Sequence, residues 1–129
     1  MYAIEVTTTF SAAHQLRLPD GVLEPLHGHN WQLTVRITAA KLDALETVID
    51  FHEIEDALAA VCGPMKNQNL NTLEPFIHKW NPSAERVAEH VGRQLLPLIA
   101  ALPDASARQV RLIEVRITEA PNCLAIWQV

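Results

Sequence analysis

The chain has 129 residues, 49% of them hydrophobic, and its 15 acidic residues outnumber its 10 lysines and arginines to give a net charge of -5. This length allows one ordinary hydrophobic core and is short for two, so we expect a single domain spanning residues 1–129. An acidic surface does not neutralise phosphates, which argues against nucleic acid as a partner.

Targeting signals and cysteine usage narrow the setting in which we expect the protein to work. The N-terminal segment lacks a basic stretch followed by an apolar one, and no segment approaches the roughly 18 uninterrupted apolar residues of a membrane span. We therefore expect a cytoplasmic protein with no membrane partner. Cys62 and Cys123 are too few for a disulfide framework or a thiolate zinc cluster, and we interpret both as small buried residues.

Two strands joined by a loop are predicted at the start of the chain. Residues 2–14 alternate in a way that is typical of a half-buried strand, and this alternation places His14 on the same face as Phe10. Residues 17–26 contain prolines, an aspartate and a glycine, which indicates a loop. The alternation resumes over residues 27–38, so the second strand begins at a pair of histidines.

Two helices are predicted in the middle of the chain. Apolar residues recur at helical spacing over residues 50–62, and the glycine and proline that follow are helix stop signals. Asn81 is a candidate N-cap for a second helix over residues 82–100, which has a proline at its first position and a possible disturbance at Pro97. The apolar stripe of this second helix is Val87, Val91, Leu95 and Leu98.

Two further strands complete the predicted fold. From Arg108 onward apolar and polar residues alternate, and Glu119 falls in line with the apolar positions Ile113, Val115 and Ile117. A short apolar segment over residues 122–129 follows a proline and is expected to pair back on this strand. The order strand-strand-helix-helix-strand-strand predicts an α+β fold, with an antiparallel sheet and two helices on one face.

Three histidines have the arrangement of a candidate metal site. His27 and His29 are two apart on a predicted strand, so they point to the same side with backbones roughly 6.7 Å apart. Zinc binds neutral imidazole nitrogens, and a catalytic zinc keeps three protein ligands and one open position. His14, at the end of the neighbouring strand, is the best third ligand. The spacing alone equally allows His27 and His29 to be surface residues.

Two glutamates also have a functional and a structural interpretation. Glu119 lies on an apolar face, where it is either a strand-end residue that reaches solvent or a carboxylate that accepts paired N–H donors from a ligand. Glu24 is either a solvated loop residue or a general acid or base, because it lies three residues before His27. The remaining histidines have no partner at ligand spacing, and we interpret them as surface residues: His52, His78 and His90.

Five short segments together resemble the 6-pyruvoyltetrahydropterin synthase and 6-carboxytetrahydropterin synthase family. The resemblance spans nearly the whole chain in the right order, and F-S-A-A-H followed by H-G-H is its most specific part. The segments are FSAAH at residues 10–14, LHGHNW at 26–31, IDF at 49–51, NPSAE at 81–85 and TEAPN at 118–122.

This resemblance implies a fold, a cofactor and a substrate. It implies the tunnelling fold, or T-fold, whose β-β-α-α-β-β subunits assemble into a barrel as a homotrimer or a homohexamer. It implies Zn²⁺ held by His14, His27 and His29. It also implies that the motif containing Thr118 and Glu119 binds a pterin, with the glutamate gripping its ring. Family members act on the small molecule 7,8-dihydroneopterin triphosphate.

The sequence departs from the usual family pattern at two places. Relatives carry a catalytic cysteine shortly before H-G-H, whereas this loop has none and offers Glu24, which resembles the subgroup that forms 6-hydroxymethyl-7,8-dihydropterin. Relatives also carry an Asp-His pair where this chain has Lys66 and Asn67, and asparagine cannot shuttle a proton as histidine does.

These departures leave three functional hypotheses. The favoured one is a zinc-dependent pterin lyase in which Glu24 is the acid or base, with weaker support for assistance by Lys66. The second is a 6-pyruvoyl- or 6-carboxy-tetrahydropterin synthase. The third is a zinc-containing protein that binds a pterin or purine without catalysis.

Overall fold

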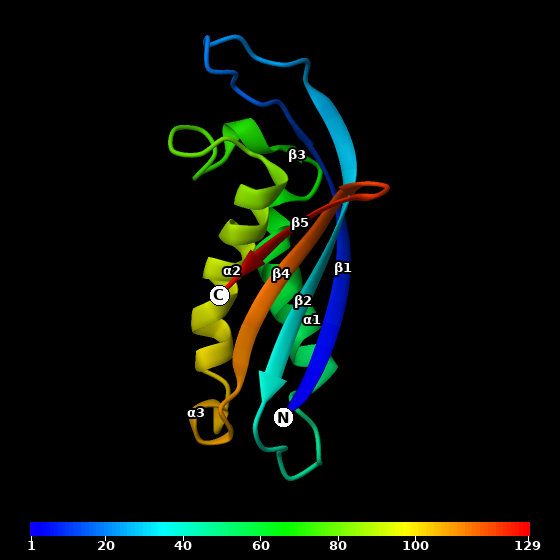
Figure 1. Ribbon diagram of the computed structural model, residues 1–129, viewed down its shortest axis with the longest axis vertical. Helices are drawn as coiled ribbons and strands as arrows, with labels where there is room; N and C mark the ends of the chain where they lie inside the picture. The colour runs from blue at the N-terminus through cyan, green and yellow to red at the C-terminus, as the bar shows by residue number, and fades with distance from the viewer.

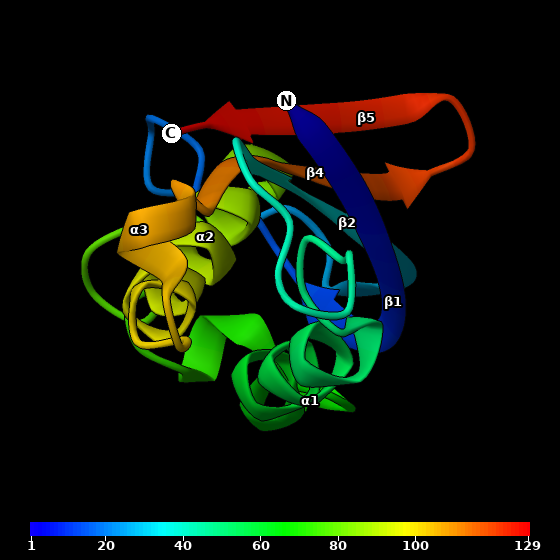
Figure 2. The same ribbon diagram turned by 90° about the horizontal axis from the view of Figure 1, so that it is seen from below.

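The computed structural model covers residues 1–129 and consists of one twisted five-stranded sheet with its helices packed on one face (Figures 1 and 2). The strands lie in the order β3-β1-β2-β4-β5. The elements are β1 Tyr2–His14, β2 His27–Ala39, α1 Phe51–Cys62, η1 Gly63–Met65, β3 Gln68–Asn69, η2 Leu70–Thr72, α2 Ala84–Ala100, α3 Ala105–Arg108, β4 Arg111–Ala120 and β5 Cys123–Gln128. None of the helices has the length and apolarity needed to cross a membrane.

The most extensive strand pairing in the fold is the antiparallel pairing of β1 with β2. The two strands are paired from Tyr2 opposite Ala39 to His14 opposite His27, without a break in register. Alternate side chains therefore fall on the helix-covered face, where residues such as Trp31 are fully buried. The α+β fold and both N-terminal strands are confirmed.

The sheet is mixed and not antiparallel throughout as the sequence predicts, because the two-residue strand β3 runs parallel to β1. β3 pairs Gln68 and Asn69 with Ala12 and Ala13, and the N–H of the preceding Asn67 donates to the Ser11 carbonyl at 2.6 Å. Two residues carry no periodicity, so the sequence could not predict this strand. It fixes the segment between the two long helices against the end of β1.

The second long helix begins later than the sequence predicts. Ser83 is the N-cap of α2, since its side chain accepts from the Arg86 N–H, whereas the predicted cap Asn81 uses its side-chain amide elsewhere. The helix continues through Pro97 to its predicted end. Its buried stripe includes Ile99, and the predicted member Leu98 is 43% exposed.

Three other expectations about single residues are wrong. Arg108 belongs to the short helix α3, so β4 begins at Arg111. A bulge opposite Arg36 and Ile37 lets β4 shift its phase, so that Leu112 lies in the core in place of Ile113. Of the cysteines, Cys62 is buried but Cys123 is exposed.

The helix α2 packs closely on the sheet at a glycine. A Cβ atom at Gly92 would lie 2.1 Å from Cζ3 of Trp127, an aromatic side chain of β5. Gly92 is buried in the middle of the helix, where glycine has a low intrinsic preference. The close approach of β5 explains why this helix carries a glycine there.

Gly92→Ala is therefore expected to destabilise the fold by about 1–3 kcal/mol, because overpacking outweighs the gain in helix propensity. Urea unfolding followed by circular dichroism measures this change. Gly63→Ala is the matched control, since Gly63 has helical backbone angles and open space around its Cβ position, and it should be neutral or stabilising. Equal stability of the two variants would contradict the packing argument.

Candidate metal centre

The β1–β2 register brings three histidines together at one end of the sheet. His14 lies directly opposite His27, and His29 lies opposite Ala12 two positions along. Their candidate ligand atoms all lie within 4.8 Å of one another, and the Nε2 atoms of His14 and His27 are 3.0 Å apart. His14 is buried, His29 is half-buried and His27 is exposed. We call this group the histidine triad.

Backbone carbonyls set the tautomers of two of these imidazoles. The Nδ1 atom of His14 lies 2.7 Å from the Pro82 carbonyl, and the Nδ1 atom of His27 lies 2.8 Å from the Pro25 carbonyl. A carbonyl oxygen only accepts, so each Nδ1 must carry the hydrogen. In the neutral rings both Nε2 atoms therefore present lone pairs toward each other.

The triad fits a bound zinc ion. Two facing lone pairs repel unless a cation lies between them, and two ligands of a tetrahedral zinc are separated by roughly 3.3 Å. The Nε2 atom of His29 is buried and has no hydrogen-bond partner, so it is free to act as a third ligand. Outer hydrogen bonds from Nδ1 to carbonyls are the usual support for metal-binding histidines.

The environment of His29 favours its neutral, metal-binding form. Burial lowers the pKa of this imidazole, and the neighbouring His14 and His27 act in the same direction, while the Glu119 carboxylate opposes them. Trp31 lies beside the triad, with its ring 4.9 Å from that of His14 and 5.6 Å from that of His29. The indole N–H of Trp31 donates to the Ala12 carbonyl and the side chain is fully buried, so the ring is held in one position beside the histidines.

A carboxylate from β4 reaches the triad through a bulge. The β4–β5 register shifts between Thr118 and Ala120, so Glu119 has no partner across the ladder. Its Oε1 atom lies 3.0 Å from Nε2 of His14 and 3.6 Å from Nε2 of His29. Thr118 and Glu119 together line a hollow of about 480 Å³ beside His29.

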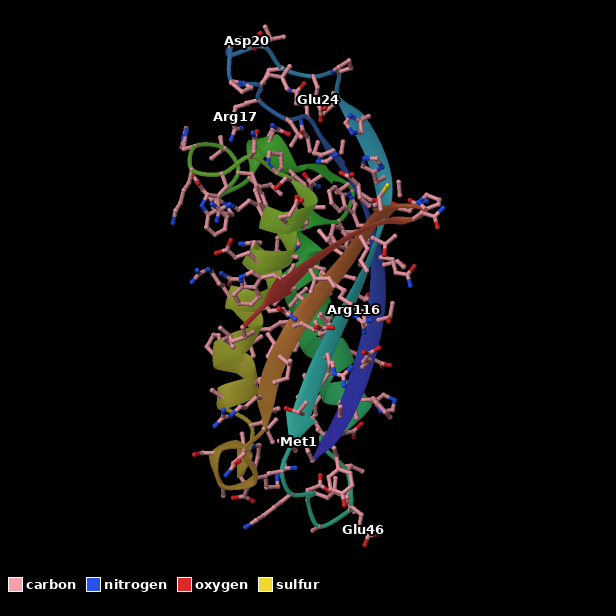
Figure 3. All side chains as sticks on the ribbon, viewed as in Figure 1. Met1, Arg17, Asp20, Glu24, Glu46 and Arg116 are labelled. Carbon is pink, nitrogen blue, oxygen red and sulfur yellow. The ribbon has the colours of Figure 1, made fainter.

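A second carboxylate approaches from the loop between β1 and β2 (Figure 3). Oε1 of Glu24 accepts a hydrogen bond of 2.9 Å from the Leu16 N–H and lies 4.0 Å from Nε2 of His27. Two asparagine amides each pair with the backbone N–H and carbonyl of one residue in this segment: Asn71 with Gln15, and Asn81 with Arg17. Glu24 is therefore positioned by a backbone that is itself held on both sides.

The predicted assistant Lys66 is not part of this arrangement. Lys66 is exposed and forms no ion pair, and it does not line the hollows next to the triad. The residues that follow it, Asn67 to Asn69, line a hollow of about 430 Å³ shared with His29 and Asn30. The structure therefore places amide groups, and not the Lys66 ammonium, on this side of the triad.

Among the other histidines, His52 and His78 are exposed as predicted, and His90 is half-buried against Phe76 with ring centroids 5.5 Å apart.

The sequence did not reveal four groups that support the site, namely the carbonyls of Pro25 and Pro82 and the side-chain amides of Asn71 and Asn81. A carbonyl has no residue-type signal. The segment N-P-S that contains Asn81 and Pro82 predicts a helix start and contributes to the family resemblance, but it assigns neither residue a place at the histidines.

A sequence model described as 6-pyruvoyl tetrahydropterin synthase matches residues 3–128. The chain belongs to this family. A 6-carboxy-5,6,7,8-tetrahydropterin synthase from Rickettsia conorii is 24% identical over 130 residues, which cover 88% of this chain and 91% of the relative.

Solved structures of the family have the same fold. The Caenorhabditis elegans 6-pyruvoyl tetrahydropterin synthase has a TM-score of 0.78 and 22% identity, covering 99% of this chain and 95% of its own. A Plasmodium vivax 6-pyruvoyltetrahydropterin synthase, described as a variant with a catalytic glutamate changed to alanine, has a TM-score of 0.77 and 20% identity, covering 100% and 99%. The resemblance and the T-fold predicted from the sequence are confirmed.

His27→Ala is expected to lower bound zinc from about one ion per chain to well below that, because two imidazoles cannot hold zinc as three do. Metal analysis after dialysis against metal-free buffer measures the effect. His52→Ala is the control, since His52 is exposed and pairs only with Asp50. A His27→Ala protein that keeps stoichiometric zinc would exclude the triad as the metal site.

Proposed function

We propose that this member of the 6-pyruvoyl tetrahydropterin synthase family is a zinc-dependent lyase. Its substrate is 7,8-dihydroneopterin or its triphosphate, and its product is 6-hydroxymethyl-7,8-dihydropterin. The observation that carries the proposal is the Glu24 carboxylate, tied to the Leu16 N–H and 4.0 Å from Nε2 of His27, in a loop that has no cysteine. A glutamate held at this distance is a base beside the metal and not one of its ligands.

Different residues of the chain have different roles in cleavage of the substrate side chain. His14, His27 and His29 would hold the zinc ion, which when bound would polarise the oxygens of the substrate side chain. Glu24 takes the proton from the hydroxyl on the outer carbon of the bond that breaks, so that this oxygen becomes the carbonyl oxygen of the departing fragment. The carbon–carbon bond then cleaves, which leaves a carbonyl on the departing fragment, and the proton returns to the carbon that stays on the ring.

Glu119 and Thr118 are proposed to bind the pterin ring. The hollow of about 480 Å³ beside His29 is lined by both residues together with Gln32. A carboxylate accepts a pair of parallel N–H bonds from the amino group and the ring nitrogen of a pterin, which fixes the ring in one orientation. The hydroxyl of Thr118 and the amide of Gln32 add donors and acceptors for the rest of the ring edge.

Two comparisons bear on the reaction. The Plasmodium vivax protein is described as having a catalytic glutamate, which supports a glutamate in that role here. The curated Rickettsia proteins are 6-carboxy-5,6,7,8-tetrahydropterin synthases, which favours that reaction as the alternative product of the same site. Lys66 and Asn67 in place of the expected Asp-His pair favour the remaining candidate, a zinc protein that binds a pterin or purine without turnover.

Zinc-loaded protein incubated with 7,8-dihydroneopterin and with its triphosphate is expected to give 6-hydroxymethyl-7,8-dihydropterin, identified by mass. Glu24→Gln should lower kcat by about 10²–10⁴ and leave bound zinc unchanged, because general acid–base catalysis contributes that much. Glu55→Gln, an exposed glutamate on α1, is the control. Binding of a pterin without consumption of either compound would refute the lyase and leave the binding protein.

We also propose that the subunit assembles through its sheet edges into a homotrimeric or homohexameric barrel. β1 pairs with β3 only at Ala12 and Ala13, so most of its outer edge is open, and β5 is the last strand at the other side. Leu124 and Ile126 of β5 are exposed on the face opposite the helices. Long unpaired edges favour pairing with another chain.

Light scattering coupled to gel filtration is expected to give three or six times the 14.4 kDa chain mass. Ile126→Lys should shift the distribution toward smaller species, because it places a charge beside the open edge of β5. Ser106→Lys, at an exposed residue of the short helix α3 that belongs to neither edge strand, is the control. A monomer at all concentrations tested would contradict the assembly.

A further inference from the structure

We propose that Glu119 is a fourth protein ligand of the metal while no pterin is bound, and that it leaves the metal when its carboxylate binds the pterin ring. This inference rests on the proposed zinc centre and pterin site. The Glu119 carboxylate is thus either a ligand of the metal or a partner of the pterin ring, and it cannot be both at the same moment. Binding of the ring thereby opens the coordination position that the substrate side chain needs.

The contacts of Glu119 distinguish it from the other carboxylate near the triad. Oε1 of Glu119 lies 3.0 Å from Nε2 of His14 and 3.6 Å from Nε2 of His29, and the carboxylate accepts no other hydrogen bond. Glu24 lies farther, 4.0 Å from Nε2 of His27, and one of its oxygens is held by the Leu16 N–H. Only Glu119 points at the place where the imidazole nitrogens converge.

The groups around the point where the imidazole nitrogens converge are electron-rich, so a positive charge at that point is stabilised. Because Nδ1 of His14 and Nδ1 of His27 donate to carbonyls, the neutral rings present lone pairs at Nε2, and the Glu119 carboxylate adds a negative charge to the same point. Such an arrangement is favourable with a divalent cation that binds both nitrogen and oxygen ligands. If the Glu119 carboxylate is a ligand of that cation, its removal weakens zinc binding.

The surroundings of Glu119 allow the carboxylate to leave. Its side chain is 28% exposed, and it lines both the hollow shared with Thr118 and a second hollow of about 250 Å³ next to the start of α2. The bulge at this position leaves the residue outside the regular ladder. Two charge-assisted hydrogen bonds from a pterin ring compete directly with its contact to the metal, since both use the same carboxylate oxygens.

The first test measures zinc affinity by competition with a chromophoric chelator, in the absence of any pterin. Glu119→Gln and Glu119→Ala are expected to weaken zinc binding at least tenfold, because removal of even an outer partner of a metal ligand costs that much. Glu114→Gln, on the same strand and paired with Arg116, is the matched control and should bind zinc as the unmodified protein does. Thermal unfolding of each metal-free variant shows whether it is folded.

The second test uses cobalt(II) in place of zinc and records its visible absorption. Addition of a pterin that has no side chain should change the spectrum of the unmodified protein toward that of cobalt-loaded Glu119→Ala without pterin. Such a ligand cannot itself react, so the change reports only the metal environment.

Unchanged or tighter zinc binding by both Glu119 variants overturns the proposal, because the carboxylate then contributes nothing to metal binding. A cobalt spectrum that is the same with and without a bound side-chain-free pterin also overturns it. In both cases the zinc centre and its reaction still stand. If the unmodified protein binds no divalent metal, the proposed zinc centre itself is wrong, and this outcome differs from loss of the Glu119 contact alone.

Discussion

The in-register pairing of β1 with β2 is the constraint on which the rest of the site depends. It runs over the full length of both strands, and its last pair is His14 opposite His27. A slip of one residue would move every side chain of one strand to the other face and separate the histidines. Burial of alternate residues such as Phe10 and Trp31 fixes this register, so the hydrophobic core and the triad are set by the same pairing.

The region beyond the end of β1 is held by side chains in addition to a single antiparallel bridge between Arg17 and Leu23. Asn71 and Asn81 each bond one residue of the segment at both its N–H and its carbonyl, as a neighbouring strand would. The Arg17 guanidinium adds bonds to the carbonyls of Phe76 and Trp80. The Leu16 N–H between these clamps holds Glu24, so residues distant in sequence position the proposed base.

The two glutamates near the triad differ in how the chain holds them, and this difference matters for their roles. Glu24 is bound to a fixed backbone group and remains at a distance from the imidazoles, which suits a proton acceptor. Glu119 contacts two imidazoles and borders open space through a bulge, which suits a group that exchanges partners. Neither carboxylate pairs with a lysine or an arginine, so both are available to offset the charge of a bound divalent cation.

The sequence by itself determined the α+β order, the N-terminal strands, the first helix with Asp50 as its start, and the histidine triad, because each rests on local periodicity or on a short motif. Only the tertiary structure decided the start of α2, the phase of β4 and the strand β3. Asn81 had two possible partners, and its bond to Arg17 from a distant segment prevailed over helix capping. Likewise the Glu119 bulge and the Pro25 and Pro82 carbonyls depend on how distant segments meet, which no local pattern records.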